Sequence, residues 1–236
     1  MNMDNDYLSL KQWLDDTRDV PLEAMDAFFN ARILDYEAHM SPWNAHYRWM
    51  AELIPDGTKA LLDIGCGTGL ELDEIFPHFP HLSVTGIDMA EEMLAKLREK
   101  HGDKNLTLIR DDYFLHPFGE AVYDGAISFE TLHHFTAETK TRLFAKICRA
   151  LKPGGFYLEC DYIASSPAIE ELVFAECRRR RERDGIPADR FVHFDTPLTL
   201  EHEMGAMKDA GFSTVELVGF LDGDNHTAMI RCTKSV

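Results

Sequence analysis

The sequence lacks paired cysteines, long apolar runs and an excess of basic residues. Its five cysteines stand singly at positions 66, 148, 160, 177 and 232 of 236 residues, with no CxxC pair. This pattern predicts reduced thiols in a cytosolic protein rather than a disulfide framework or a zinc site. No segment approaches the roughly 18 apolar residues of a membrane span. The N-terminal stretch MNMDNDYLSLKQWLDD is acidic and polar, which is not typical of a signal peptide, so we expect a cytoplasmic protein.

Basic residues are outnumbered by acidic ones, 24 to 41, which gives a net charge of −17. Such a field repels nucleic acid and favours small or cationic ligands. One segment departs from this balance, because Arg178–Arg183 holds five arginines in six positions. A solvated helix end is the favoured interpretation of this run, and a contact with an anion or with RNA stays open as an alternative.

Apolar runs of strand length alternate with segments of helical period from residue 60 onwards. This alternation predicts a doubly wound, mostly parallel α/β sheet. The last two strands are joined by the short turn 221–225, which cannot hold a helical crossover, so we expect an antiparallel C-terminal hairpin. The expected helices are 90–101, 136–151 and 200–210. The seven expected strands are 60–64, 82–88, 105–110, 123–129, 155–162, 213–220 and 226–233.

Two segments fall outside this alternation. Residues 1–59 are helical in pattern and rich in aromatic side chains, which predicts an N-terminal helical lid. Residues 60–236 are expected to form the α/β domain, with a cap insertion at about 163–199.

Three glycines follow the first expected strand, at Gly65, Gly67 and Gly69 in DIGCGTG. Glycine packs no side chain, so this loop predicts a ligand that closely approaches the backbone at the carboxyl end of the strand. The second strand ends at Asp88, 19 residues beyond the last glycine, which is the spacing of a carboxylate that accepts hydrogen bonds from ribose hydroxyls. Together these features predict a ligand that contains a nucleoside.

The GxGxG spacing after an acid resembles the class I, Rossmann-like S-adenosylmethionine-dependent methyltransferases. The resemblance covers roughly residues 33–162 and includes the blocks GIDMAEEML, RDDYFLHPF, YDGAISFETLHHF and ALKPGGFYLECD. It implies S-adenosyl-L-methionine as cofactor, with Asp88 on the ribose, Met89 on the adenine ring and Asp112 on the adenine amino group. The cofactor-binding residues that the resemblance implies are Tyr36, Asp63, Gly65, Cys66, Gly67, Asp88, Met89, Asp112, Tyr113, Ser128 and Phe129.

Methyl transfer from a sulfonium is an in-line displacement in which the protein mainly aligns the reactants, and a base is needed only for a protonated acceptor. His133 follows the fourth strand, and His193 lies in the segment expected over the acceptor, so these two are the candidate catalytic bases. The sequence has SFET (Ser128–Thr131) where methyltransferases of exocyclic base amines carry (D/N)PP(Y/F). We therefore expect a small-molecule acceptor and no nucleic acid or membrane partner. Sequence spacing shows no set of metal ligands, so no metal is expected.

Other functions stay open at this stage. The segment 193–212 resembles the carboxy-S-adenosylmethionine synthase-like proteins, which serve tRNA modification, and Arg190 or the arginine run could face the added carboxylate. A module that binds S-adenosylmethionine without turnover is a further alternative. The sequence also leaves a monomer and a homodimer open.

Overall fold

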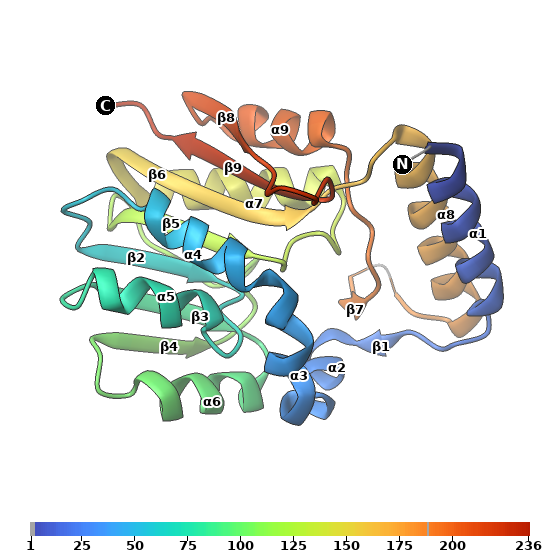
Figure 1. Ribbon diagram of the computed structural model, residues 1–236, viewed down its shortest axis with the longest axis horizontal. Coiled ribbons are helices and arrows are strands. Elements are labelled where there is room, and N and C mark those ends of the chain that lie inside the picture. The colour runs from blue at the N-terminus through green and yellow to red at the C-terminus, as the bar shows by residue number, and fades with distance from the viewer. Residues whose placement is uncertain (1–2, 188) are drawn as a thin grey trace.

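A seven-stranded sheet forms the centre of the molecule (Figure 1), and the computed structural model describes residues 3–187 and 189–236. The strand order is β4-β3-β2-β5-β6-β9-β8, parallel from β4 to β6, with β9 antiparallel to both of its neighbours. The predicted fold class and the terminal hairpin are thereby confirmed. The strands are β2 Ala60–Ile64, β3 Ser83–Asp88, β4 Leu106–Arg110, β5 Tyr123–Phe129, β6 Leu151–Tyr162, β8 Thr214–Gly219 and β9 Thr227–Thr233.

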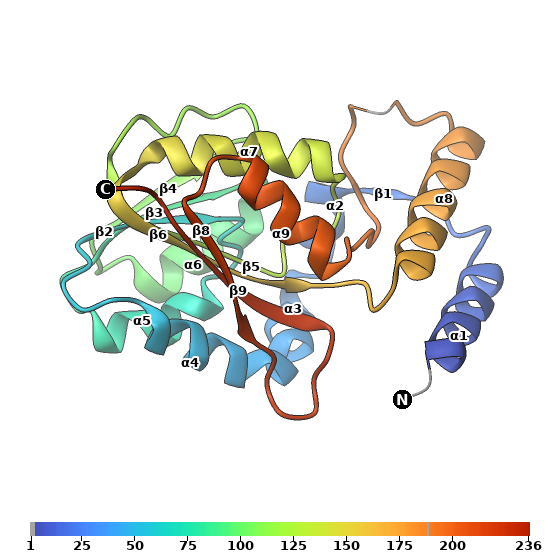
Figure 2. The same ribbon diagram turned by 90° about the horizontal axis from the view of Figure 1, so that it is seen from above.

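Helices cover both faces of this sheet (Figure 2), as a parallel sheet with crossover connections requires. α4 and α5 pack with Leu94 and Leu97 of α6 on one face, whereas α7, α9 and Phe212 pack on the other. The central strand β2 is therefore buried on both sides, which explains its continuous apolar run. The helices are α4 Asn44–Leu53, α5 Leu70–His78, α6 Glu91–His101, α7 Ala137–Ala150 and α9 Leu200–Asp209.

Gly125 shows how closely the middle of the sheet is packed. A Cβ atom at this position in β5 would lie 2.2 Å from the ring of Phe156 in β6. The register of this strand pair also shifts between Tyr123 and Gly125. β6 begins at Leu151, four residues before the start of the strand predicted at 155–162. The Lys152–Gly155 stretch, expected as a turn, is part of this strand.

The chain before β2 and the segment after β6 meet beside the carboxyl ends of the strands. α1 (Met3–Asp16) packs against α8 (Pro167–Asp184), side by side in Figure 1. β1 (Glu23–Ala24) pairs with β7 (Val192–His193), and α2 (Met25–Ala31), α3 (Ile33–Met40) and the 3₁₀ turn Ser41–Trp43 lead on to α4. The division into a lid at 1–59 and a cap at 163–199 stays a prediction.

The arginine run lies near the end of α8, where several of its side chains bond within the chain. Arg180 is 3% exposed, bonds Glu176 and donates to the hydroxyl of Thr17, which follows α1. Arg179 and Arg183 both donate to the carbonyl oxygen of Arg18. These contacts hold α8 against the chain just after α1. They give Arg179, Arg180 and Arg183 partners within the protein, without an external ligand.

Candidate functional site

The glycine loop lies where the strand order reverses, between β2, which leads to β3 and β4, and β5, which leads to β6. Gly65 and Gly69 both have positive φ, at 68° and 72°. A Cβ at Gly65 would lie 2.2 Å from the Thr131 hydroxyl, and one at Gly69 would lie 2.3 Å from Leu97. Only glycine fits this backbone at these two positions. The N–H groups of Gly65 and Cys66 donate to the Ile87 carbonyl oxygen, which holds the loop against the end of β3.

Asp88 fixes this loop from the end of β3. One carboxylate oxygen accepts from the Gly67 N–H at 3.0 Å, and the other accepts from the Ala90 N–H at 2.8 Å. Burial raises the pKa of Asp88, although these backbone donors act in the opposite direction. Since an ionised carboxylate offers about four acceptor positions, each oxygen retains capacity for another donor.

A cavity of about 50 Å³ lies between this loop, α2 and α3, and we call it the glycine-loop cavity. Ligand sites usually enclose about 300–1,000 Å³, so a nucleoside fits only if part of this wall moves. Phe29 and Tyr36, from α2 and α3, close the side opposite Gly67. The predicted cofactor residues that line it are Tyr36, Gly65, Gly67, Asp88, Met89, Tyr113 and Phe129.

Two of the predicted cofactor residues are buried and do not line the cavity: Asp63 at the end of β2 and Cys66 within the loop itself. Burial raises the pKa of Asp63, and the neighbouring Glu71 raises it further. Burial also raises the pKa of Glu71 to about 7. One Asp63 carboxylate oxygen has no hydrogen-bond partner among the described residues. The two carboxyl groups thus form a buried acidic pair beneath the glycine loop.

The other two predicted cofactor residues that do not line the cavity are engaged within the fold. Asp112 accepts a hydrogen bond from the N–H of Phe114 at 2.7 Å. The Ser128 hydroxyl bonds the Tyr157 hydroxyl at 2.7 Å, and both side chains are buried. The assignment of all eleven residues to the cofactor stays a prediction.

A second cavity of about 1060 Å³ adjoins the first, and we call it the acceptor cavity. The two cavities share four wall residues, Phe29, Tyr36, Glu130 and His134. Both predicted catalytic histidines, His133 and His193, line the acceptor cavity. Most of its other wall residues come from α2, α3, the 3₁₀ turn, α4 and the segment 221–227, and Tyr162 at the end of β6 contributes as well.

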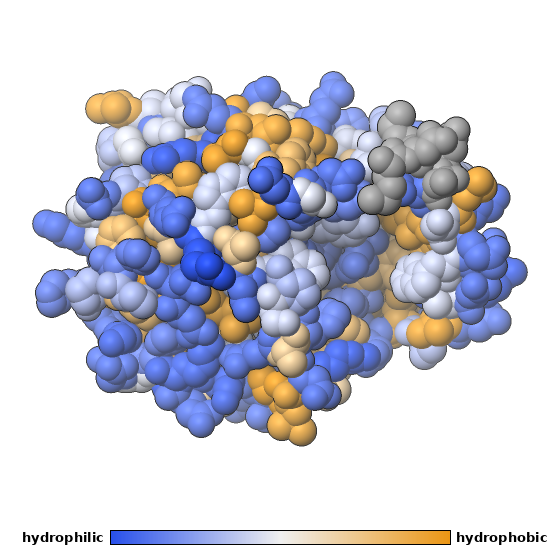
Figure 3. Space-filling view, in the orientation of Figure 1, coloured by the Kyte–Doolittle hydropathy of each residue, from blue (hydrophilic) through white to orange (hydrophobic). Residues whose placement is uncertain are grey.

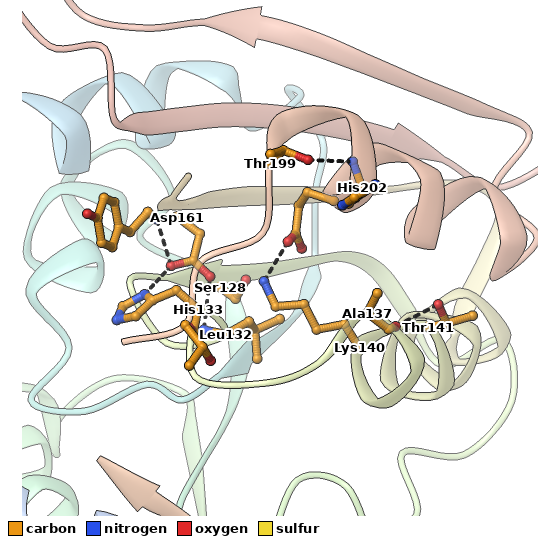
Figure 4. A network of polar contacts seen from close by, with 12 residues as sticks. Ser128, Leu132, His133, Ala137, Lys140, Thr141, Asp161, Thr199 and His202 are labelled. Carbon is orange, nitrogen blue, oxygen red and sulfur yellow. Dashed lines mark hydrogen bonds and ion pairs between the residues drawn. The ribbon is translucent and has the colours of Figure 1, made fainter. Parts of the chain in front are cut away.

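His133 is held rigidly at the base of the acceptor cavity (Figure 4). Its Nδ1 lies 2.5 Å from an Asp161 carboxylate oxygen, and Asp161 also accepts from the Leu132 and Tyr162 N–H groups. Burial alone lowers the pKa of His133, but Asp161 and Asp195 outweigh it and leave this pKa well above the usual value. The two carboxylates thus favour a positive charge at this ring, so His133 is a poor candidate for a free base.

The second predicted base, His193, lies on β7, and its ring centroid is 4.9 Å from that of His134. Its ring stacks on Phe28, with 3.4 Å between the ring centroids. Burial lowers the pKa of His193 to about 4. The ring is therefore neutral near pH 7, and its stacking on α2 holds it over the acceptor cavity.

Three further residues reach the site without having been predicted as site residues. His134 lines both cavities, and burial together with the neighbouring His133 lowers its pKa to about 3. Glu130 adopts a positive φ of 44° directly after β5, a strained conformation for a residue other than glycine. Asp195 reaches the same wall from the segment after β7. The doubled histidine in ETLHHF was a visible signal for His134, whereas no sequence pattern pointed to Asp195.

Comparison with known proteins decides the family. Residues 61–155 match the family model described as a methyltransferase domain. This segment belongs to the class I S-adenosylmethionine-dependent methyltransferase family, which the sequence resemblance predicted. The match spans most of β2, the glycine loop and the strands up to the start of β6, whereas α2 and α3, which complete the glycine-loop cavity, lie outside it.

Relatives of this methyltransferase chain are distant. It is 26% identical over 190 residues to the O-methyltransferase cnsE of Penicillium expansum, which covers 78% of this chain and 63% of that protein. It is 30% identical over 166 residues to the bifunctional biotin biosynthesis protein BioHC of Teredinibacter turnerae, which covers 66% of this chain and 27% of that protein. The chain thus spans less than two thirds of either relative.

The fold also agrees with a solved structure of human N-acetylserotonin methyltransferase in complex with S-adenosylmethionine. The TM-score is 0.60 at 19% identity, over 85% of this chain and 55% of that chain. Within residues 3–187 and 189–236, no helix is both long and apolar enough to span a bilayer.

Proposed function

We propose that this protein transfers the methyl group of S-adenosyl-L-methionine to a small molecule bound in the acceptor cavity. The observation that carries this proposal is the wall shared by the two cavities. Phe29, Tyr36, Glu130 and His134 face both the glycine loop and the 1060 Å³ space, so a ligand in one cavity can touch a ligand in the other.

The residues around the glycine loop fit S-adenosylmethionine. Asp88 keeps acceptor capacity for the two ribose hydroxyls while it holds the Gly67 N–H. Gly67 has a positive φ of 47°, which favours glycine, and its backbone lies close to the Tyr36 hydroxyl in the cavity wall. Met89 and Tyr113 provide the apolar wall that an adenine ring requires.

When bound, S-adenosylmethionine supplies a methyl group on a positively charged sulfur, which is already activated for displacement. The protein then has to orient the acceptor and exclude water. Phe29 and Tyr36, from α2 and α3, cover the glycine loop and would exclude water from it. Since the glycine-loop cavity is only about 50 Å³, we propose that α2 and α3 move outward to admit the cofactor.

The charge of the acceptor cavity supports a small molecule over a nucleic acid. Five carboxylate residues line it, whereas Arg32 is its one arginine among the described residues, and Glu23 binds Arg32 at 2.8 Å. A phosphate backbone would be repelled by this wall. Its carboxylate residues are Asp35, Glu130, Asp195, Asp222 and Asp224.

A variant that fills the acceptor cavity tests this proposal. Ala45 lines the cavity from α4 and is exposed, so Ala45→Trp adds bulk without removing a core contact. We expect kcat/KM for the metabolite that accepts the methyl group to fall at least about tenfold, because the tryptophan occupies the acceptor's space. Affinity for the cofactor should stay within about twofold of the wild type. Ala95→Trp on the exposed side of α6 is the matched control. Equal activity of both variants would contradict the assignment of the acceptor to this cavity.

A further inference from the structure

Three metal-binding side chains converge on the wall of the acceptor cavity. One nitrogen from each of His133 and His134 and one oxygen from Asp195 lie within 4.8 Å of one another. The Asp195 oxygen is 3.6 Å from His133 Nε2 and 3.4 Å from His134 Nδ1. These separations are longer than those of ordinary hydrogen bonds. Bonds of about 2.0–2.2 Å from a tetrahedral Zn²⁺ place neighbouring donor atoms about 3.4 Å apart, so the spacing suits a shared ion.

Two independent features of the same residues point to a cation. The His134 side chain is 3% exposed, and its Nδ1 has no hydrogen-bond partner among the described residues although it faces Asp195. The His133 ring bonds Asp161 through Nδ1 (Figure 4). Its Nε2 is the ring nitrogen nearest Asp195, at 3.6 Å. A carboxylate behind a histidine is the usual outer partner of a metal-binding imidazole, because it orients the ring and increases its basicity.

We propose that His133, His134 and Asp195 bind one divalent metal ion of the zinc class at the wall of the acceptor cavity. Imidazole and carboxylate donors suit zinc and its late first-row neighbours. Three protein ligands leave a coordination position open, and all three residues line the acceptor cavity. An oxygen atom of the acceptor binds at that position, a role that rests on the proposed function, whereas metal binding itself does not.

The sequence concealed this arrangement because the third ligand is distant in the chain. Asp195 follows β7, which pairs with β1, and Thr196 next to it donates its N–H to the His133 carbonyl at 2.8 Å. The fold thus fixes Asp195 opposite the two histidines. The expectation of no metal considered sequence spacing only, and spacing within the chain cannot show such a juxtaposition.

Metal titration of the tag-free full chain tests the proposal without cofactor or acceptor. After treatment with a chelator and dialysis, calorimetry with ZnCl₂ and visible absorption with CoCl₂ report stoichiometry and affinity. We expect one ion per chain, and at least about tenfold weaker binding in Asp195→Ala. Because Asp195 is 49% exposed, its removal leaves the core intact, which a thermal melt verifies. His39→Ala, a histidine elsewhere on the cavity wall, should bind as the wild type does.

Binding to the wild type no tighter than to Asp195→Ala would overturn the metal site, as would an equal loss in His39→Ala. Asp195→Asn, which keeps the shape of the side chain, should also bind Zn²⁺ at least several times more weakly. The proposed role of the ion in binding the acceptor has a separate test: kcat/KM for the metabolite that accepts the methyl group should fall after chelation and return with Zn²⁺. Unchanged kcat/KM in the metal-free protein would overturn that role and leave methyl transfer itself intact.

Discussion

Replacing Asp88 with alanine tests the cofactor assignment at its most specific contact. In the structure both Asp88 oxygens bond backbone N–H groups and keep capacity for two more donors in the glycine-loop cavity. Hydrogen bonds to a charged group are worth about 1.5–3 kcal/mol each, so losing two should weaken binding by about 3 kcal/mol. At 1.4 kcal/mol per factor of ten, Kd should rise about a hundredfold. Titration calorimetry with S-adenosylhomocysteine, the unreactive product, measures this directly.

Asp73→Ala is the matched control, since Asp73 lies in the first turn of α5, next to the loop, and bonds Lys100 on the outer surface. It should change Kd by less than about twofold, because it faces away from the cavity. A thermal melt of each variant checks that the loop still folds without its carboxylate anchor. A folded Asp88→Ala protein with wild-type affinity would refute the assignment of Asp88 to the ribose.

Three further predictions concern stability. Lys140 and Glu203 form a fully buried pair at 2.6 Å. Lys140→Met leaves Glu203 buried without its partner, so the free energy of unfolding in urea titrations should fall by about 3–5 kcal/mol. A second change, Glu203→Leu, should restore much of that loss. Gly125→Ala should cost at least about 1–3 kcal/mol in the same assay, because the new methyl group overlaps the Phe156 ring; no change in midpoint would contradict this packing. Burial raises the pKa of Glu71 from 4.5 to about 7, so the folded state holds a proton that the unfolded state releases, and this contribution to stability is lost as pH rises from about 4.5 to 7. Glu71→Gln should therefore gain stability relative to the wild type between pH 5 and pH 8, and a constant difference would be evidence against it.

Much of the fold follows from the sequence because the signals for β2, the glycine loop, β3 and the terminal hairpin are local. Apolar runs, glycines and turn length are read along the chain, and the alternation of strands and helices predicts parallel pairing. The strand order itself was not predicted and comes from the structure. The β1–β7 pair escaped prediction, since strands of two residues carry no periodicity. Packing of α1 on α8 escaped for a related reason: it depends on buried contacts such as Arg180 to Thr17, from residues far apart in the sequence.

The site was predictable only where backbone position decides it. Gly65, Gly67 and Asp88 take their places from the end of a strand, so their order sufficed. Ser128 and Phe129 were both expected beside the cofactor, but successive residues of a strand face opposite sides. Phe129 lines the glycine-loop cavity, whereas Ser128 bonds Tyr157 inside the sheet.

The most direct measurement for the central claim is transfer of label from methyl-labelled S-adenosylmethionine. The full chain is incubated with a metabolite extract and, separately, with bulk tRNA, and the products are divided by size. We predict label in a product small enough for the 1060 Å³ acceptor cavity, at a rate that Asp88→Ala reduces. Label in tRNA, or binding of the cofactor with no label in either fraction, would contradict methyl transfer to a small molecule.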